Sequence, residues 1–598
     1  MKKTRYSVKT VCLLAMCGVA LFANAQDDKK KEQDLNRQMT LEREYDPSVQ
    51  DASKVNTLPQ VKEPEVRKIP IDYSDYTLAM DPAQQISVLP SGNIMTQMDY
   101  NKRRGYLRLG AGTYMNLNGD FGYHALSTAT DQLSIAFSHR SANGNVKYIQ
   151  LPDEKVKAKI NDNLGGLKYA HAFEKASLNV GLNYGYSAYN YYGLSMCSFS
   201  SLPMQDLLNK ADRETNQVNQ TIAATLGVES KEDADLAYLV DLGFVNFSRK
   251  YGISKDTDGP KETTIEAKVN VSKRFNGDMR FGLEALVEYF NYSLPAEKAL
   301  PNGGLYICEF ENHAEVALHP YYEVEGENWK VRLGANVMLK TGDESLFMAT
   351  PNVAANFEVA DKTELYIKAN GKLYSNSMYE MSKINRYLPA EELTPSRNWL
   401  DGVLGIKSGV APGFWFDIFA GYKMTSDDVL FVPGRTFEEG GFGNFSEAMS
   451  GINTKQLFVG ASLKYSYQQL FELTLKGQYN NWKAEYGDEW IGFSDSSLEH
   501  AWGKPEMELN AGVMVRPMDK LAVALDYSLA TGRYTLLAGV DLYKMNNINE
   551  LNLTATYTLN DTFGFYAKVN NLLSQKYELY YGYPMQRLSA QVGVNINF

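Results

Sequence analysis

The sequence predicts an all-β chain that closes into a large transmembrane antiparallel up-and-down β-barrel of about 22 strands. Three observations lead to this prediction. Many short segments alternate between apolar and polar residues, and the connections between these segments alternate between short turns and long loops. The N-terminus also carries an export signal, after which no run of eighteen apolar residues occurs. An exported chain without an apolar helix that nevertheless spans a bilayer must do so with strands.

The alternation is clearest in the last strand. Its apolar side chains are Leu588, Ala590, Val592, Val594, Ile596 and Phe598, and polar residues or glycine stand between them. A period of two places the two kinds of residue on opposite faces of a strand. Segments 507–515 and 551–559 repeat the pattern. We expect Val592, Val594, Ile596 and the aromatic Phe598 to form the barrel-assembly signal. A soluble β-sandwich alternates as well, so this pattern does not decide alone.

The lengths of the connections separate a barrel from a sandwich. Short connections rich in Gly, Asn, Asp and Pro occur at 275–278, 324–327, 359–362, 411–413, 516–519 and 559–562. Long polar connections occur at about 142–157, 195–216, 253–261, 377–396, 426–453 and 485–503. Short periplasmic turns and long external loops are typical of outer-membrane barrels. Counting strands from Gly105 gives about 22, an even number, with an uncertainty of two.

The N-terminus has the features of a signal peptide. Lys2, Lys3, Arg5 and Lys9 precede an apolar run at 11–22, which is too short to cross a bilayer. Cleavage is expected after Ala23-Asn24-Ala25, so that the mature chain begins at Gln26. A lipoprotein signal ending at Cys17 is the less favoured alternative, because the apolar run continues beyond that residue.

Residues 26–104 form a leader between the signal peptide (1–25) and the predicted barrel (105–598). The leader is charged at its start and carries Pro47, Pro59, Pro64, Pro70, Pro82 and Pro90. Spaced prolines in a polar chain favour extended or disordered backbone, which we expect either in the periplasm or entering the lumen.

Composition and motifs argue against several functions. The formal net charge of −11 disfavours nucleic acid as a partner. The six histidines have no metal-ligand spacing, and no nucleophile, phosphate or zinc motif occurs, so we predict no enzyme, no cofactor and no metal. Cys197 and Cys308 are expected to be unpaired thiols rather than a disulfide bridge.

Two stretches carry a family resemblance. Residues 569–577 read VNNLLSQKY and are followed by Gly582-Tyr583-Pro584-Met585 and Arg587. Residues 393–398 read LTPSRN and lead to Leu404-Gly405-Ile406-Lys407. The chain resembles the TonB-dependent receptors over about residues 100–598. The resemblance singles out Leu393, Pro395, Asn571, Leu572, Gly582, Tyr583, Pro584 and Arg587. The second Pro-Gly of the family's G-Y-P-x-P-G-R and the Glu after its L-x-P are absent.

The resemblance implies a receptor-type barrel, but the leader differs from the family's N-terminal plug. Residues 26–104 are too few and too polar to be that globular domain, and they contain no convincing energy-coupling motif. We therefore expect a plugless barrel. Its wide lumen must be occluded by the leader, by the loops around 377–396, 426–453 and 485–503, or by another protein.

Two loops contain aromatic residues among polar ones. These are 490–493 with Trp502, and 379–387. Such aromatics could contact sugars or proteins. The favoured interpretation is that they belong to an aromatic girdle or to loops folded into the barrel.

The functional prediction is a protein of the Gram-negative type of outer membrane that acts within an outer-membrane transport or envelope complex. The alternatives are a TonB-coupled or passive transporter or channel for nutrients and, third, an outer-membrane enzyme. Expected partners are outer-membrane lipid, the barrel-assembly machinery and periplasmic or surface proteins, with no nucleic acid. The sequence does not identify a substrate.

Overall fold

The computed structural model describes residues 103–598 apart from 195–215, 232–235, 253–257, 276, 297, 300–304, 307–308, 343–344, 410, 435–444, 488–498 and 538–540. The predicted signal peptide, with Ala23, Ala25 and Gln26, lies outside the described residues. So do nearly all of the leader and both Cys197 and Cys308.

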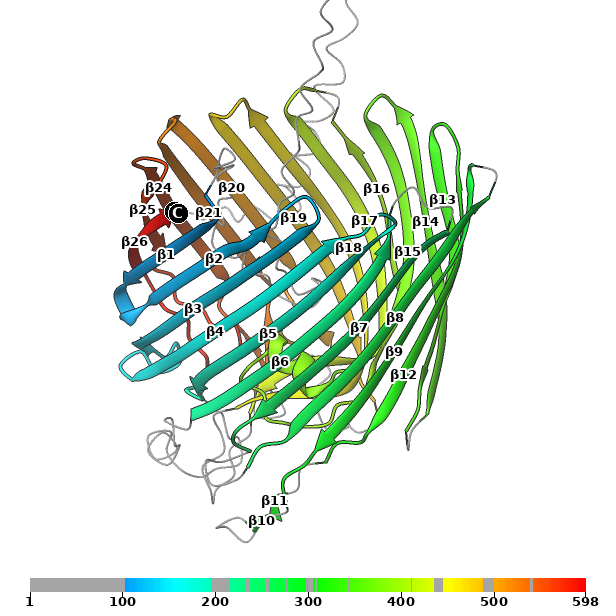
Figure 1. The fold of residues 1–598 in the computed structure, drawn as a ribbon. Coiled ribbons are helices and arrows are strands. Elements are labelled where there is room, and N and C mark those ends of the chain that lie inside the picture. Colours follow the sequence, from blue (N-terminus) through cyan, green and yellow to red (C-terminus); the bar gives the residue numbers. More distant parts are fainter. Residues whose placement is uncertain are drawn as a thin grey trace, which may run out of the picture. The chain divides into compact units, whose positions relative to one another are not determined.

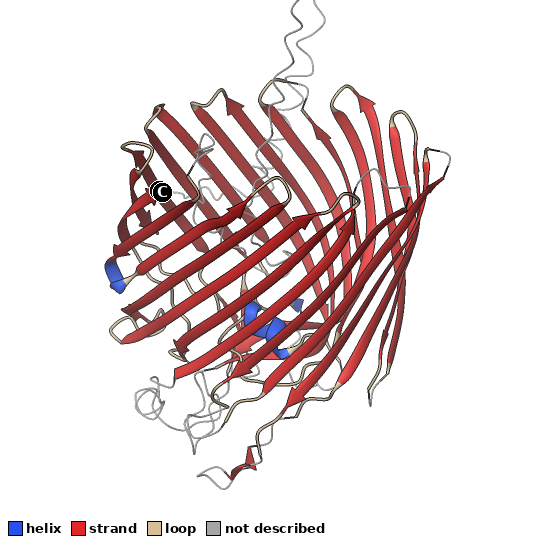
Figure 2. Ribbon diagram, in the orientation of Figure 1, coloured by secondary structure: helices blue, strands red, loops and turns tan. Residues whose placement is uncertain are grey.

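The described chain is almost entirely strand (Figures 1 and 2). The elements are β1 (Gly105–Gly112), the 3-10 turn η1 (Thr113–Met115), β2 (Leu117–Ser127), β3 (Asp131–Lys147), β4 (Lys155–Ala172), β5 (Ala176–Asn190), β6 (Asn216–Ser230), β7 (Leu236–Arg249), β8 (Lys261–Phe275), β9 (Met279–Ser293), β10 (Lys298–Ala299), β11 (Leu305–Tyr306), β12 (His313–Glu325), β13 (Trp329–Lys340), β14 (Leu346–Ala360), β15 (Thr363–Tyr374), α3 (Met378–Ile384), β16 (Ser396–Ser408), β17 (Phe414–Pro433), β18 (Ser446–Tyr467), β19 (Phe471–Glu485), β20 (Met507–Met518), β21 (Leu521–Thr531), β22 (Tyr534–Leu537), β23 (Asp541–Lys544), β24 (Ile548–Thr558), β25 (Phe563–Asn570) and β26 (Ser589–Asn597).

Twenty-two of these strands form one closed antiparallel sheet, which confirms the predicted fold class. Strands adjacent in sequence pair with each other, and β1 also pairs with β26 to close the ring. The backbone N–H of Gly105 donates to the carbonyl of Phe598 at 2.8 Å, and the reverse bond measures 2.9 Å. A closed ring leaves no unpaired strand edge, as a bilayer requires.

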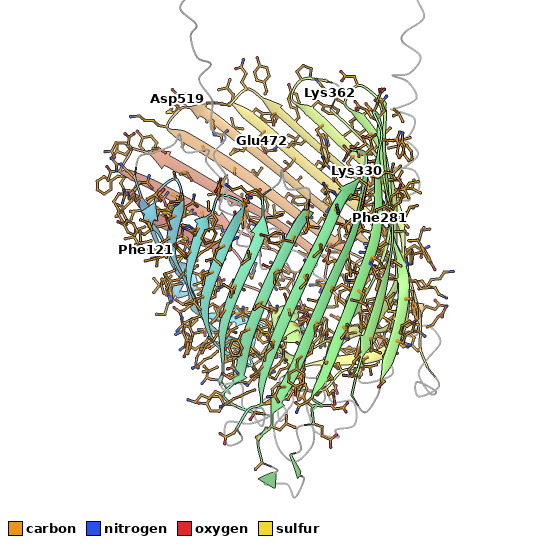
Figure 3. All side chains as sticks on the ribbon, turned by 45° about the vertical axis from the view of Figure 1, so that its right-hand side comes forward. Phe121, Phe281, Lys330, Lys362, Glu472 and Asp519 are labelled. Atoms are coloured by element: carbon orange, nitrogen blue, oxygen red, sulfur yellow. The ribbon has the colours of Figure 1, made fainter. Side chains whose placement is uncertain are left out.

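The predicted alternation sorts side chains between the lumen and the outer face. On β26, Val592 is 65% exposed on the outer face, whereas its neighbour Gln591 is 6% exposed on the lumen side. Exposed aromatic residues gather near the short-turn end of the barrel, among them Phe281, Trp329, Trp415, Tyr467, Phe563 and Phe598. Figure 3 shows Phe281 near that end, below charged residues such as Lys362 and Asp519. An apolar outer wall with an aromatic girdle is the surface of a transmembrane barrel in an outer membrane.

Connection length is sorted by end, as predicted. The turns around 277, 327, 361, 412, 519 and 560 all lie at the end that carries Gly105 and Phe598, and the long loops lie at the other (Figure 1). The alternation is not strict, because the connections at 113–116 and 341–345 are short although they belong to the long-loop end. No helix among the described residues is long and apolar enough to cross a membrane.

Two predicted loops are mainly strand. The 142–157 loop is reduced to 148–154, because β3 and β4 pair up to Lys147 and Lys155. The 426–453 loop is reduced to 434–445, because β17 and β18 pair up to Pro433 and Ser446. The extended part of the second hairpin buries Leu430 and Ile452 completely against other loops. Tertiary packing therefore stabilises strand in segments whose polar composition predicted loops.

Close packing on the lumen side marks the closing seam between β26 and β1. The ring of Tyr566 lies across Gly593 and Gly110, and a Cβ atom on Gly593 would stand 2.3 Å from the ring. The guanidinium of Arg108 covers this ring at 4.2 Å from its centroid. Glycine is needed at 593 because any side chain would displace the tyrosine.

Candidate functional site

The candidate site is the set of loops that packs together inside the long-loop mouth of the barrel. We call this set the cap, and it consists of the described parts of 148–154, 191–194, 375–395, 486–506, 532–547 and 571–588. Its central element is residues 375–395, which we call the crossing loop and which carries helix α3. Figure 2 shows this helix within the barrel near the long-loop end.

Local sequence explains why the crossing loop contains a helix. Ser377 is the N-cap, and its hydroxyl accepts a hydrogen bond from the backbone N–H of Glu380 at 3.3 Å. Met378 and Met381 lie on the buried face of the helix. The carboxylate of Glu262, on β8, accepts hydrogen bonds from the Ser377 hydroxyl at 2.9 Å and from the Tyr379 N–H at 3.0 Å. A carboxylate from the barrel wall therefore holds the start of the helix.

Two other wall strands hold the second half of the crossing loop. Arg249, on β7, donates to the carbonyl of Leu388 at 2.9 Å and to the hydroxyl of Tyr191 at 2.5 Å. The hydroxyl of Tyr189, on β5, donates to the carbonyl of Arg386 at 2.5 Å. Arg249 and Tyr189 are almost completely buried, so water does not compete effectively for these hydrogen bonds.

An ion pair reaches farthest across the barrel. The guanidinium of Arg386 donates to both carboxylate oxygens of Asp162, on β4, at 3.2 and 3.1 Å. The crossing loop leaves the wall at β15. In the 22-stranded ring, β4 and β15 are separated by β5, β6, β7, β8, β9, β12, β13 and β14. The loop therefore spans nearly the full width of the mouth.

A cluster of tyrosines joins the crossing loop to the 571–588 loop. The rings of Tyr387 and Tyr583 stack with centroids 3.9 Å apart and planes at 19°. The ring of Tyr192 meets both edge-on, at 5.6 Å from Tyr387 and 5.1 Å from Tyr583. The Tyr580 hydroxyl donates to the carbonyl of Ile384 at 2.6 Å. Such aromatic pairs stabilise by about 0.5–1.5 kcal/mol each beyond the area that they bury.

Two buried charged residues order the 571–588 loop. Glu578 accepts hydrogen bonds from the side-chain amide of Gln150 at 2.8 Å and from the backbone N–H of Gly582 at 2.7 Å. Burial raises the pKa of Glu578 to about 7. Arg533 is fully buried and donates to the carbonyls of Glu578, at 2.8 Å, and of Leu579. Burial lowers the pKa of Arg533 to about 10. The arginine thus satisfies carbonyls that water cannot reach.

An apolar cluster secures the cap on the β17–β18 side. Trp502 is 1% exposed and packs with Leu430, Ile452 and Leu536. Beside this cluster, the ammonium of Lys504 lies 3.6 Å from the carboxylate of Asp428. The 486–506 loop is therefore attached to the barrel wall by apolar burial and by a buried ion pair.

The structure brings the two family-like stretches together in the cap, although they are far apart in sequence. Tyr583 is in the tyrosine cluster, and the carbonyl of Pro584 accepts from the Tyr192 hydroxyl at 3.3 Å. Gly582 has φ +81°, which favours glycine. Leu393 packs beside Met381 in the crossing loop.

The other family-like residues lie at the margin of the cap. Pro395 is buried just before β16, and Leu572 is 43% exposed. Asn571 is buried at the exit of β25, where its side-chain oxygen accepts from the Gln575 N–H at 2.9 Å. Arg587 donates to the carbonyl of Ser574 at 3.3 Å. These contacts order the turn that follows β25.

The loop aromatics are folded inward where the structure describes them. Trp502, Tyr379 and Tyr387 pack inside the cap, which confirms the interpretation of folded-in loops for these residues. Residues 490–493 lie outside the described part of the chain. His313 and His319 are both on β12 and bond separately to the Glu311 carbonyl and to Asn336. Within the described ranges, no three His, Cys, Asp or Glu side chains form a metal-binding group.

Sequence reasoning missed the wall residues that hold the crossing loop. All three lie on lumen faces: Arg249 and Glu262 are at the loop ends of β7 and β8, and Asp162 is near the middle of β4. A charged residue at such a position is a detectable signal, but the sequence does not identify its partner. As a whole, this arrangement is suited to closing the mouth.

Comparison with known proteins gives a likeness in fold. No family model and no curated protein sequence matches the chain. A solved structure of Pseudomonas aeruginosa FpvA bound to a heterologous pyoverdine matches with a TM-score of 0.60 and 10% identity, covering 83% of this chain and 72% of that one. The ferric-catecholate import receptor Fiu from Escherichia coli matches with a TM-score of 0.58 and 10% identity, covering 83% of this chain and 82% of that one. The FrpB iron transporter from Neisseria meningitidis matches with a TM-score of 0.62 and 10% identity, covering 83% of this chain and 82% of that one. The barrel therefore has the fold of the TonB-dependent receptors, as the sequence resemblance predicted.

Proposed function

We propose that this chain is a receptor-type outer-membrane barrel without a folded plug, which serves as a fixed member of an outer-membrane transport or envelope complex. The observation that carries this proposal is the crossing loop, held by Asp162, Tyr189, Arg249 and Glu262. A barrel of this width needs an occluding element. Here the chain's own loops supply one at the external mouth, so the membrane barrier does not depend on a plug.

The construction of the cap favours a permanent closure. Its contacts combine buried charged residues, stacked aromatics and apolar clusters from six loops. Opening the mouth would expose the fully buried Arg533 and Trp502, and it would separate Tyr387 from Tyr583. A lasting closure suits a structural member of a complex, which holds partners rather than passing a solute. We assign it no catalytic role.

A gated transporter is the second candidate, and the lumen wall favours it. Lumen-facing ion pairs join neighbouring strands, including Lys268 with Glu284 at 3.2 Å and Lys407 with Glu364 at 3.0 Å. A polar wall of this kind is compatible with a wet passage. FpvA, Fiu and FrpB are named as receptors or transporters of iron or of its carriers, which adds weight to this alternative.

Copurification from detergent extract tests the first proposal. We expect stoichiometric protein partners with the full-length barrel and no steady conductance when the purified protein is placed in a planar bilayer. Deleting residues 27–95 behind an intact signal should leave the barrel inserted and closed to large antibiotics by the cap, but it should remove periplasmic partners. Absence of partners together with a substrate-dependent uptake defect would favour the transporter instead. Dependence on the energy transducer, with direct cross-links to it, would establish the import function.

A further inference from the structure

Four lysines form a ladder on the outer face of the β3–β4 hairpin, beyond the apolar belt. Lys147 and Lys155 are direct cross-strand partners, Asn145 stands opposite Lys157, and Asn143 stands opposite Lys159. The alternate residues Val146 and Val156 are 4% and 5% exposed because they pack into the cap. Since neighbouring residues of a strand point to opposite faces, the lysines point away from the lumen.

The ladder has no compensating acid among the described side chains. No carboxylate lies within 4.0 Å of these four ammonium groups in the described ranges, although Lys147 and Lys155 are paired directly. Like charges in direct cross-strand positions repel each other and destabilise a sheet. A similar pair on β18 and β19, Lys455 with Lys483, differs because Glu485 forms an ion pair with Lys455. The β3–β4 ladder is therefore open to an external anion.

A row of hydrogen-bonding side chains separates the ladder from the apolar belt. The two ring nitrogens of His139 bond to Asn163 at 2.7 Å and to Ser141 at 3.1 Å, and Asn163 donates to Asn161 at 2.8 Å. Lys159 pairs with Asn143, which is four residues beyond His139 and hence about 13 Å farther along the strand. The outer face of this hairpin thus changes from apolar to amide and imidazole, and then to cationic.

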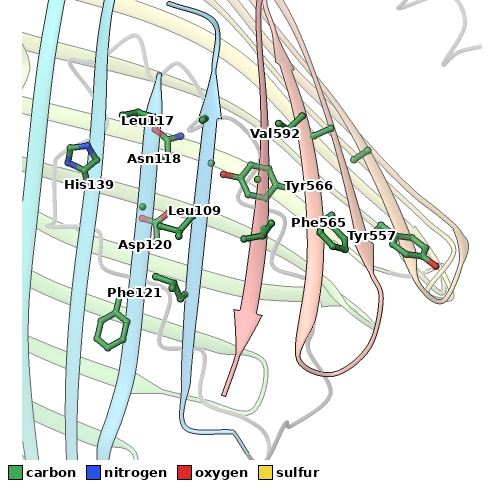
Figure 4. Close-up of a pocket in the computed structure, with 18 of the residues that line it drawn as sticks. Leu109, Leu117, Asn118, Asp120, Phe121, His139, Tyr557, Phe565, Tyr566 and Val592 are labelled. Carbon is green, nitrogen blue, oxygen red and sulfur yellow. The ribbon is translucent and has the colours of Figure 1, made fainter. Parts of the chain in front are cut away.

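Below this row, the lipid-facing wall is hollowed. A hollow of about 1000 Å³ extends from β21 across the closing seam to β3, and both Phe137 and His139 line it. Small outward residues such as Ala111 and Gly119 lie between larger ones such as Leu109 and Val592. Figure 4 shows this hollow with Leu109, Val592 and His139 around it. His139 connects the hollow to the polar row.

We propose that this face binds an anionic glycolipid of the outer leaflet. The acyl chains lie in the hollow, the sugar hydroxyls contact the His139–Asn163 row, and phosphate groups bind the ladder of Lys147, Lys155, Lys157 and Lys159. The order of surface chemistry along the hairpin is the order of groups along such a lipid. The bound phosphates relieve the repulsion between Lys147 and Lys155, which otherwise remains uncompensated.

Lipid binding to the purified full-length protein in detergent tests this proposal. The probes are an acylated glucosamine disaccharide with two phosphates, the same lipid without phosphates, and phosphatidylglycerol. We expect the phosphorylated glycolipid to bind about tenfold or more tightly than either other lipid, and this preference to weaken as salt is raised. Equal affinity for the two glycolipids, or for phosphatidylglycerol, would overturn the assignment.

Two variants and a control separate the ladder from a general surface effect. Replacing all four lysines with alanine should abolish the preference for phosphate, whereas replacing them with arginine should retain it. Lys483→Ala, on the compensated hairpin, should leave it unchanged. Heat-modifiable migration reports folding of each variant, and the wild-type lipid series and its salt dependence decide the matter if the alanine variant does not fold. An unchanged preference in a folded alanine variant, or an equal loss in Lys483→Ala, would exclude this site.

Discussion

Arg386 and Asp162 form a two-pronged ion pair across the mouth of the barrel, with N–O distances of 3.2 and 3.1 Å. The two residues are 224 positions apart in sequence, and the crossing loop that carries Arg386 leaves the ring at β15, far from Asp162 on β4. Each side chain is 32% exposed, so the pair is partly screened by water. It therefore acts as one of several ties on the crossing loop rather than as its sole anchor.

Removing this tie should loosen the crossing loop without unfolding the barrel. Arg386→Ala is expected to cost the cap about 1 kcal/mol, which corresponds to roughly fivefold faster amide exchange in α3. Hydrogen exchange of the purified protein measures this effect. Lys330→Ala, which breaks the ion pair with Glu323 at the short-turn end, is the matched control and should leave α3 unchanged. Equal exchange in the wild type and Arg386→Ala would show that the pair does not hold the loop.

The stack of Tyr387 on Tyr583 should be the stronger tie, because both rings lie inside the cap. Tyr583 is 1% exposed, and truncating a buried aromatic residue costs about 3–5 kcal/mol. Tyr583→Ala should make the 571–588 loop susceptible to protease at concentrations that leave the wild type intact. Tyr583→Phe keeps the ring and should remain resistant. Resistance of the alanine variant would mean that other contacts suffice to hold the loop.

The cap should be more stable at mildly acidic than at alkaline pH because of Glu578. Burial raises the pKa of this carboxyl from 4.5 to about 7 when the loop is packed. The packed state then holds more protons than the open state between these two values, so its stability falls as pH rises from about 4.5 to 7. Protease resistance of 571–588 should decrease over this range.

Glu578→Gln should remove this pH dependence. The new glutamine imitates the protonated acid because its side-chain N–H can donate a hydrogen bond. The acceptor is Oε1 of Gln150, which lacks a described hydrogen-bond partner and becomes accessible when the Gln150 amide turns. Protease resistance that varies with pH equally in the wild type and the variant would assign the effect to another group.

The last strand should be sensitive to charge on its outer face only. Val594 points toward lipid, so Val594→Asp places a carboxylate in the apolar belt. The free-energy cost is lower than for an Arg or Lys at the bilayer midplane, which costs about 2–4 kcal/mol. We expect the folded, heat-modifiable barrel to be lost from the membrane. Deletion of Phe598, whose ring centroid lies 6.1 Å from that of Tyr123, should have the same effect. Asn595→Asp, on the lumen face, is the control and should assemble normally. Normal assembly of Val594→Asp would contradict the role of this strand as an assembly signal.

Accessibility on intact cells should follow connection length. With Cys197 and Cys308 replaced by serine, cysteines at Gly440 or Asp495 should react with a membrane-impermeant maleimide. Cysteines at Gly277, Pro412 or Met518, at the short-turn end, should react only after the outer membrane is opened. Labelling of the second set on intact cells would reverse the topology and place the cap in the periplasm.

The sequence by itself determined the barrel. Alternation along 588–598 assigned Val592 and Gln591 to opposite faces, and connection length assigned most turns and loops to an end of the barrel, with 113–116 and 341–345 as exceptions. These features are local, because side-chain direction repeats every two residues and a short turn joins only adjacent strands. The strand count and the fold class followed from them, whereas the motifs at 393–407 and 569–587 carried the resemblance to the TonB-dependent receptors.

Only the tertiary structure decided how the long-loop mouth is closed. The bond between Gln150 and Glu578 joins residues 428 positions apart, and the partners of Arg249 and Arg386 lie in other loops and strands. Such contacts depend on which loops the closed ring places together, and no local periodicity encodes them. For the same reason the strand segments 142–147, 155–157, 426–433 and 446–453 were predicted as loops: their polar composition matches a loop, and burial against the cap makes them strand.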